Sequence, residues 1–253
     1  MSASARRAPL LAPLSLLIAF FACGPALARG GFASWAAIVI AGDDHAAHAA
    51  VPTRAFDNAR RDIAALLARR GFSAAHIAQF SADPAKGSGV SPDDPKLLLA
   101  ALARLTAAAP GGCLFYITSH GNPDGVVFGS RMAPPIALER TFDQYCPNRP
   151  VVAVISACFS GVFIPALKGP DRLVLTAARA DRSSFGCSES DLYPYFDACM
   201  LKVLPHAASF IAVIPLVRRC VAEKEREEDV GPPSDPQAFV GPKLPSNLPA
   251  FSP

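Results

Sequence analysis

A histidine and a cysteine follow two strongly apolar runs of the chain. His120 comes directly after residues 112–119 (GCLFYITS), and Cys158 comes two residues after residues 151–156 (VVAVIS). A thiolate is a strong nucleophile, and an imidazole within reach can activate the thiol and later protonate a leaving group. We therefore predict that His120 and Cys158 form a catalytic pair.

Glycines accompany both residues and strengthen this interpretation. Gly121 follows His120, and Gly161 lies three residues after Cys158. Without a Cβ atom, backbone N–H groups can approach a reacting carbonyl and stabilise its oxyanion. Alone, such a histidine is commonly a loop residue bonded to backbone, and such a cysteine a packing residue or half of a disulfide. Their joint occurrence favours catalysis.

The elements that must position this pair alternate between short apolar runs and amphipathic stretches, which is typical of a sheet with crossover helices. Near-continuous apolar character indicates strands buried on both faces, as in a parallel sheet. The predicted strands are residues 34–41, 73–80, 112–119, 151–156 and 172–177. Ligands of such sheets bind outside the carboxyl ends of the strands, so His120 and Cys158 would face one crevice.

Helices are predicted between these strands and after them. Residues 56–70 place Ile63, Leu66 and Leu67 on one face, with Gly71 as the C-cap. The other predicted helices are residues 95–107, opened by Pro95, 191–203 and 207–228. Residues 82–94 are predicted as a loop. From residue 231 onward Pro, Ser and Gly dominate, so residues 231–253 are predicted to be a disordered tail outside the fold.

Three segments resemble, in order and spacing, the legumain family of cysteine peptidases, a family of the caspase-like clan. They are residues 114–121 (LFYITSHG), 154–161 (VISACFSG) and 175–185 (LTAARADRSSF). The resemblance extends to residues 35–42 (WAAIVIAG) and covers roughly residues 34–195. The histidine precedes the cysteine, whereas papain-like enzymes have the reverse order. By this resemblance the chain is an exported bacterial member of the peptidase family C13.

The resemblance implies a fold and a mechanism. The fold would be a caspase-like three-layer α/β/α sandwich with a central, mostly parallel sheet. Cys158 would attack the scissile carbonyl, His120 would act as general acid to the leaving amine, and the N–H groups of Gly121 and Cys158 would bind the oxyanion. No third catalytic residue, metal or organic cofactor is implied, and the partner would be a peptide or protein substrate.

Substrate choice departs from the family pattern. Legumain-like enzymes that cut after Asn have an acidic residue two positions before the catalytic cysteine, where this chain has Ser156. A hydroxyl there lacks the charged acceptor that helps an Asn amide to bind. Asp191 falls near the second pocket acid of the family, and Arg54 lies one position from its pocket arginine. Both are candidate substrate-binding residues, although a helix N-cap and an exposed arginine are the ordinary alternatives.

The chain contains seven cysteines: Cys23, Cys113, Cys146, Cys158, Cys187, Cys199 and Cys220. Export would place them where disulfides persist. Cys158 must remain a thiol for catalysis. Cys113 lies in an apolar run and is predicted to be a small buried hydrophobic residue. The predicted disulfide partners are Cys146, Cys187, Cys199 and Cys220, with the connectivity left open.

The start of the chain has the three parts of a secretory signal peptide. Arg6 and Arg7 precede an apolar run over residues 10–22, and small residues follow, so we predict cleavage after Ala28. The mature protein would then be periplasmic or extracellular. A permanent membrane helix is disfavoured because the run is shorter than the roughly 20 residues that span a bilayer. The sequence FACG around Cys23 resembles a bacterial lipobox, so membrane attachment through a lipidated Cys23 remains an alternative.

Charge and the remaining polar residues exclude other classes of function. The formal net charge is +3, and Lys and Arg are scattered instead of forming a block that could follow a phosphate backbone, so nucleic-acid binding is not predicted. Asp43, Asp44, His45 and His48 occupy a Gly/Ala-rich loop without cysteine partners. We interpret them as a solvated loop and not as a metal site.

These observations predict three regions: a signal peptide over residues 1–28, a caspase-like catalytic domain over residues 29–230 and the tail. The predicted activity is that of a cysteine endopeptidase that uses a His/Cys dyad and a thioester acyl-enzyme. One alternative is a transamidase, because the catalytic subunit of the GPI-anchor transamidase belongs to the same family and an amine can resolve an acyl-enzyme as water does. A non-catalytic envelope protein that uses this fold for binding is the other alternative.

Overall fold

The structure is a computed structural model of the 253-residue chain, and it describes residues 1, 31–46 and 51–252. The predicted signal peptide, its cleavage site after Ala28 and Cys23 lie outside the described residues, as does His48. None of the helices in the described residues combines the length and apolar character that a membrane span requires.

A seven-stranded sheet with the order β10-β9-β8-β4-β1-β2-β3 forms the centre of the molecule. All neighbouring strands are parallel except β9 and β10, which are antiparallel. The strands are β1 (Trp35–Ala41), β2 (Ile77–Ser81), β3 (Ser91–Pro92), β4 (Gly112–Thr118), β8 (Val151–Ser156), β9 (Arg172–Thr176) and β10 (Gln237–Val240). A separate three-stranded sheet consists of β5 (Gly121–Asn122), β6 (Gly125–Phe128) and β7 (Arg131–Ala133).

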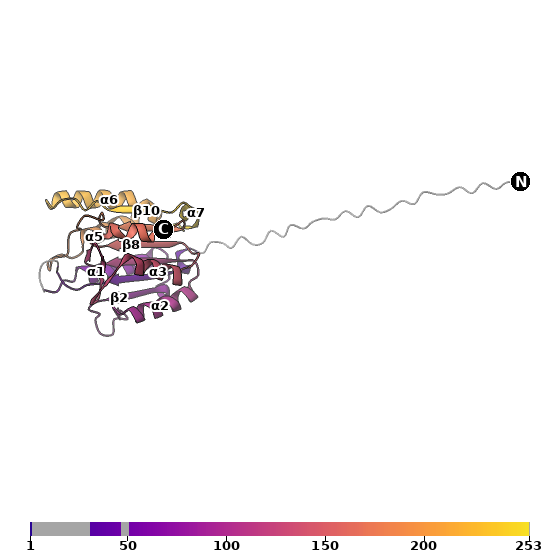
Figure 1. Ribbon diagram of the computed structural model, residues 1–253, viewed down its shortest axis with the longest axis horizontal. Helices are drawn as coiled ribbons and strands as arrows, with labels where there is room; N and C mark the ends of the chain where they lie inside the picture. Colours follow the sequence, from indigo (N-terminus) through magenta and orange to yellow (C-terminus); the bar gives the residue numbers. More distant parts are fainter. Residues whose placement is uncertain (2–30, 47–50, 253) are drawn as a thin grey trace.

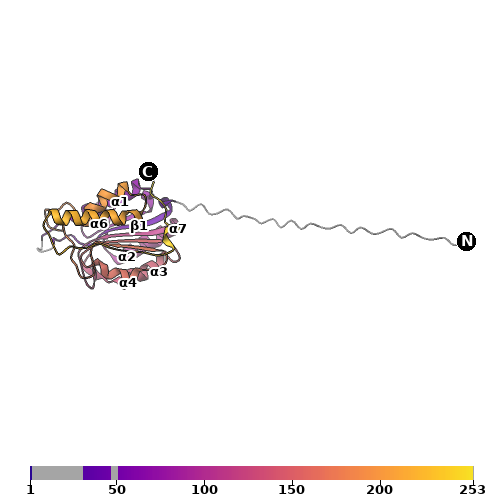
Figure 2. The ribbon, with the colours of Figure 1, turned by 90° about the horizontal axis from the view of Figure 1, so that it is seen from above.

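Helices cover both faces of the central sheet, as Figure 2 shows for α1 and α6 on one side and α2, α3 and α4 on the other. The α-helices are α1 (Ala55–Arg69), α2 (Pro95–Ala108), α3 (Pro135–Tyr145), α4 (Ile164–Leu167), α5 (Tyr195–Val203), α6 (Phe210–Glu227) and α7 (Leu244–Asn247). Short 3-10 helices lie at Phe32–Ser34, Ala74–His76, Ser160–Phe163 and Leu204–His206. The predicted three-layer α/β/α fold is therefore confirmed.

Successive side chains of each strand alternate between the two faces of the central sheet, and each face has its own hydrophobic core. In β4, Leu114 and Tyr116 pack into the core with α1, α5 and α6, whereas Phe115 and Ile117 pack into the core with α2 and α3. All seven residues of β4 are buried. Successive side chains of a strand point to opposite faces, so a strand covered on both sides is largely apolar on both faces.

Local signals set several of the helix ends. Asp94 caps α2 because its Oδ1 accepts hydrogen bonds from the N–H groups of Lys96 and Leu97, and Pro95 occupies the first turn. Gly71, predicted to end α1, has φ +105°, a conformation that side chains with a Cβ rarely adopt. The predicted helix over residues 191–203 begins only at Tyr195.

The prediction for the tail was wrong. Residues 237–240 form β10, which pairs with β9 so that Phe239 lies opposite Val174. Leu244 and Phe251 are buried in the core with α1, α5 and α6. Figure 1 shows β10 and α7 folded against the rest of the molecule beside α6. Pro and Gly limit the regular structure of this segment, yet its few large apolar side chains still bury themselves.

The prediction for Cys113 was also wrong. Cys113 forms a disulfide with Cys146, and Cys199 forms one with Cys220. The first bond joins the start of β4 to the residue after α3, and the second joins α5 to α6. Cys187 takes part in neither bond.

Candidate active site

The register of the central strands brings the two predicted catalytic residues together. Thr118 at the end of β4 lies directly opposite Ser156 at the end of β8. The N–H of Ser119 then donates to the carbonyl oxygen of Ser156 at 3.0 Å. His120 and Cys158 each follow two residues after the Thr118 and Ser156 pair, so the two chains leave the sheet side by side. The predicted shared crevice is therefore present.

Gly121 allows a close approach between the two segments that leave the sheet after β4 and β8. A Cβ atom at position 121 would lie 2.5 Å from the carbonyl oxygen of Cys158 and 3.0 Å from the Cβ of Ala157. The first distance is shorter than the contacts that real Cβ atoms make, and the second is at the tight limit of such contacts. The glycine that follows His120 is thus required so that the backbone can pack directly against residues 157 and 158.

One cavity of about 510 Å³ opens over these residues. His120, Gly121, Cys158 and Phe159 line one part of it, together with Ala46. The rest of the lining comes from the loop between β9 and α5, which we call the cavity loop (residues 183–191): Ser183, Ser184, Phe185, Gly186, Cys187, Ser188, Glu189 and Asp191. Both His120 and Cys158 are half-buried, so a ligand in the cavity can reach them.

The imidazole of His120 is held on two sides. Its Nε2 lies 2.9 Å from the carbonyl oxygen of His45, and its ring meets that of Phe56 edge to face at 5.0 Å between centroids. A carbonyl oxygen can only accept a hydrogen bond, so Nε2 carries the proton. In the neutral ring the lone pair is then on Nδ1, the nitrogen that remains for proton transfer.

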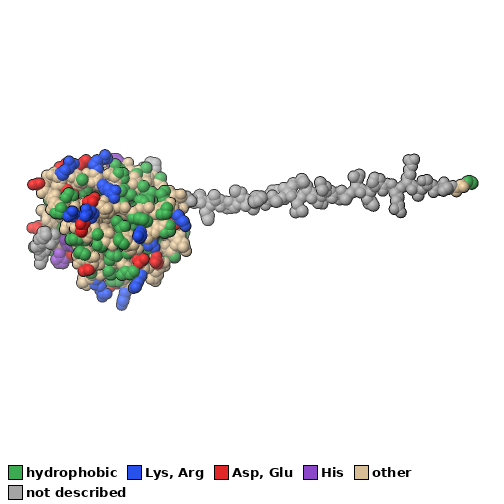
Figure 3. All heavy atoms as spheres, turned by 45° about the horizontal axis from the view of Figure 1, so that its top comes forward, with side chains coloured by type: hydrophobic (Ala, Val, Ile, Leu, Met, Phe, Trp, Pro, Cys, Tyr) green, Lys and Arg blue, Asp and Glu red, His purple; other side chains and the backbone are tan. Residues whose placement is uncertain are grey.

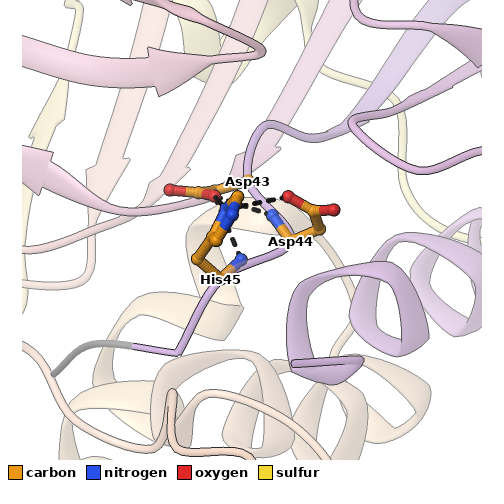
Figure 4. A group of neighbouring side chains, drawn as sticks. All are labelled: Asp43, Asp44 and His45. Carbon is orange, nitrogen blue, oxygen red and sulfur yellow. Dashed lines mark hydrogen bonds and ion pairs between the residues drawn. The ribbon is translucent and has the colours of Figure 1, made fainter. Parts of the chain in front are cut away.

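The residue that orients His120 belongs to a small charged cluster after β1, which Figure 4 shows. The Nδ1 of His45 lies 3.0 Å from Asp43 Oδ1 and 2.9 Å from Asp44 Oδ1. The hydrogen bond to Asp43, together with the negative charge of both carboxylates, raises the pKa of the exposed His45. The imidazole therefore compensates the charge of the two carboxylates beside it.

Cys158 has an N–H donor directed at its sulfur. The N–H of Ser184 lies 3.2 Å from Sγ, and Sγ lies 3.5 Å from the carbonyl oxygen of Ser184.

The backbone directly after Cys158 is strained. Phe159 has φ +57°, which is an outlier for a bulky residue, and its N–H donates to the carbonyl oxygen of Arg182 at 2.7 Å. In the described part of the chain, no backbone acceptor takes the N–H of Cys158. A strained conformation such as that of Phe159 persists where the surrounding structure enforces it.

The three predicted substrate-binding residues lie in different places. Asp191 lines the cavity, and its Oδ2 accepts hydrogen bonds from the N–H and the hydroxyl of Ser188 at 2.7 and 2.6 Å. Ser156 is buried and is not part of the cavity lining. Arg54 also lies outside the lining and forms ion pairs with Asp57 at 3.3 Å and Asp83 at 3.5 Å.

Sequence reasoning missed a buried carboxylate below the pair. Asp197 in α5 has no exposed surface, and three hydroxyl groups donate to it: Tyr116 at 2.5 Å, Thr118 at 2.7 Å and Ser156 at 2.8 Å. Burial raises the pKa of Asp197 to about 6, although the three hydrogen bonds lower it. Because Thr118 and Ser156 end β4 and β8, this carboxylate ties α5 to both strands that lead to His120 and Cys158.

A second carboxylate missed from the sequence is Asp93, which follows β3. Both of its oxygens are buried and lack a hydrogen-bond partner within the described residues. Burial raises the pKa of Asp93 to about 7, and the charges of Asp43 and Asp44 add to this shift. The N–H of Gly129 lies near enough to lower this pKa, but it donates its hydrogen bond to Gly42 at 2.9 Å.

Charge of the two signs is mixed over the surface. On the face that Figure 3 shows, basic and acidic side chains are interspersed among hydrophobic ones. This mixture accords with the small formal net charge of +3.

Solved structures with a similar fold are caspases. Caspase-1 from Spodoptera frugiperda superposes with a TM-score of 0.59 and 14% identity, covering 84% of this chain and 88% of that one. Pro-sf-caspase-1 gives a TM-score of 0.56 at 14% identity, covering 81% and 90%. No curated protein matches the chain. The chain therefore has a caspase-like fold.

A comparison of the sequence itself finds a similarity to one peptidase family. Residues 108–204 match the Peptidase C13 family, and this segment contains His120, Cys158, Asp191 and Asp197. The matched segment is less than half of the chain, and it lies within the caspase-like fold.

Proposed function

We propose that the protein is an endopeptidase that cleaves peptide bonds through a His120 and Cys158 dyad and a thioester acyl-enzyme. One observation carries this proposal: the two residues leave adjacent parallel strands at matching positions and line the same cavity of about 510 Å³. Thiol and imidazole are the two groups that nucleophilic acyl transfer requires. The peptidase family and the caspase-like fold support the same reaction class.

Activation of the thiol begins the reaction. Because the carbonyl oxygen of His45 fixes the proton of His120 on Nε2, Nδ1 can accept the proton of the Cys158 thiol. The N–H of Ser184 at 3.2 Å from Sγ supports negative charge on the sulfur. The products of this step are a thiolate and an imidazolium, which face the same cavity.

Acyl transfer then proceeds in two stages. The thiolate forms a bond to the scissile carbonyl carbon, and the carbonyl electron pair moves to oxygen, where the N–H groups of Gly121 and Cys158 stabilise it. The C–N bond breaks as Nδ1 of His120 gives its proton to the leaving amine, which leaves a thioester. Water next attacks the thioester, with His120 taking one of its protons, and the products are a carboxylate and the restored thiol after proton return.

Export from the cytoplasm is part of the proposal. The disulfides Cys113–Cys146 and Cys199–Cys220 support it, because disulfides persist in oxidising compartments and are rare in reducing ones. Cleavage after Ala28 remains a prediction, and determination of the N-terminal residue of the mature protein tests it.

Two matched substitutions test the dyad. Cys158→Ala and His120→Ala should each lower kcat/KM for a peptide substrate by about 1000-fold or more, because neither group can replace the other. His76→Ala is the control, since His76 bonds to the carbonyl oxygen of Ala33 and lies outside the cavity. Mass spectrometry of the product should find a free carboxylate. Retained cleavage in Cys158→Ala, or a new amide in the product, would contradict the proposal.

A further inference from the structure

Apart from the imidazole of His120, the charged side chains that line the cavity in the described residues are all acidic. Glu189 and Asp191 contribute two carboxylates, and the described residues that line the cavity include no Lys or Arg. The remaining lining residues are His120, glycine, alanine, phenylalanine, cysteine and serine. A substrate side chain that enters this cavity therefore meets an acidic environment.

Asp191 is held as a rigid acceptor. Both donors from Ser188 reach Oδ2, and no donor in the described part of the chain contacts Oδ1. The side chain is half-buried, so one oxygen is fixed and the other remains for a ligand. A partly buried carboxylate forms stronger hydrogen bonds with a cationic partner than a fully solvated one does.

Contacts with α1 and the residues before it hold the cavity loop and its continuation in place. The hydroxyl of Thr53 donates to the carbonyl oxygen of Ser188 at 2.9 Å, and Nδ2 of Asn58 donates to that of Leu192 at 3.2 Å. The hydroxyl of Tyr193 donates to Asp62 at 2.6 Å. The position of Asp191 is thus set before any substrate binds, which lowers the entropic cost of binding.

Arg54, which directly precedes α1, does not line the cavity. Arg54 is directed to Asp57 and Asp83, at 3.3 and 3.5 Å. His45, whose carbonyl oxygen bonds to His120, is paired with Asp43 and Asp44. Each of these cations therefore has its own carboxylates.

We propose that the cavity selects substrates with a Lys or Arg side chain on the acyl side of the cleaved bond, with Asp191 as its ion partner. Glu189, which is exposed, adds negative charge at the rim. This inference rests on the proposed peptidase function and specifies its substrate class. The side chain would enter beside Cys158 while its carbonyl faces Sγ.

Two other substrate classes fit the cavity less well. An Asp side chain would place a third carboxylate beside Glu189 and Asp191. An Asn amide needs an acceptor and a donor, and the hydroxyl of Ser156 is already bonded to Asp197. A hydrogen bond to a cation is stronger than one to a neutral amide, so the lining favours Lys and Arg over both.

The test uses purified full-length protein and fluorogenic peptides that differ only in the residue before the cut. We expect kcat/KM for Arg and Lys peptides to exceed that for Asn, Asp and norleucine peptides by about 100-fold. Asp191→Asn should lower the Arg and Lys values by about 10- to 100-fold and change the norleucine value by less than about 3-fold. Asp143→Asn is the control, since Asp143 lies outside the cavity.

A second variant keeps the test decisive if Asp191→Asn does not fold. The exposed Glu189 can be changed to Gln, which should lower kcat/KM for Arg and Lys peptides by about 3- to 10-fold at low salt and less at high salt. Cleavage that depends on Cys158 but prefers Asn or Asp would overturn the inference and leave the peptidase function standing. Cleavage of none of the peptides would count against both.

Discussion

Two carboxylates at the carboxyl edge of the sheet have opposite surroundings. Asp197 receives three hydroxyl donors from β4 and β8, whereas neither oxygen of Asp93 has a partner within the described residues. Burial raises the pKa of both, to about 6 for Asp197 and about 7 for Asp93. The difference shows that burial alone does not make a carboxylate stabilise the fold. Asp197 contributes stability because three hydroxyl groups donate hydrogen bonds to it, and Asp93 lacks such donors.

Removal of the Asp197 side chain should have the largest effect. Asp197→Ala leaves the hydroxyls of Tyr116, Thr118 and Ser156 without their acceptor in a buried site. We expect the free energy of unfolding to fall by about 3 kcal/mol, measured by denaturant titration. Asp143→Asn, which breaks an exposed ion pair with Arg172, should cost less than about 1 kcal/mol. Equal effects of the two substitutions would remove the distinction between Asp197 and an ordinary surface carboxylate.

The pH dependence of stability should show the raised pKa of Asp197. Folding raises this pKa from 3.8 to about 6, so the folded state binds the proton more tightly and Asp197 contributes most to stability below about pH 4. The contribution declines as pH rises to about 6 and is constant above it, a change of up to about 3 kcal/mol since one pKa unit is worth about 1.4 kcal/mol. The difference between wild type and Asp197→Asn, measured by unfolding at pH 4 to 7, should follow this decline. A constant difference would mean that the carboxyl titrates normally.

Replacement of Asp93 should have a smaller effect, in the opposite direction. Its folded pKa of about 7 lies above the ordinary value of 3.8, so stability falls as pH rises from about 4 to about 7 and is constant above that, because no donor compensates the buried charge. Asp93→Asn should therefore raise the free energy of unfolding by about 1 kcal/mol at pH 8 and have little effect at pH 4, where the carboxyl of the folded state is neutral and that of the unfolded state is only partly ionised. Thermal melting at both pH values measures this. Destabilisation at pH 8 would indicate that Asp93 has a partner.

The sequence predicted the centre of the fold well because burial on both faces leaves a clear pattern. Strands β1, β4, β8 and β9 match the apolar runs within one or two residues. The elements that were missed lack this pattern: β10 has four residues, and α3 follows two prolines after a short meander. Cys113 was misassigned because a disulfide depends on the distance to Cys146 in space, which an apolar neighbourhood does not reveal.

For the site, the sequence predicted His120, Gly121 and Cys158 around one cavity, since they follow strand ends, and the resemblance added Asp191. Ser156 and Arg54 were linked to the cavity by resemblance, and their orientation could not be predicted. Asp197 was missed although a signal existed. Tyr116, Thr118 and Ser156 are polar positions in otherwise apolar strands, and such residues require a buried partner.

The two outer strands of the central sheet are both very short. β3 has two residues and β10 has four, and they flank five longer parallel strands. A long open strand offers a row of unpaired amides and carbonyls to which a neighbouring molecule can add. Truncation before residue 237 would expose β9 in this way, so shortened versions of the protein should self-associate at concentrations where the full chain does not.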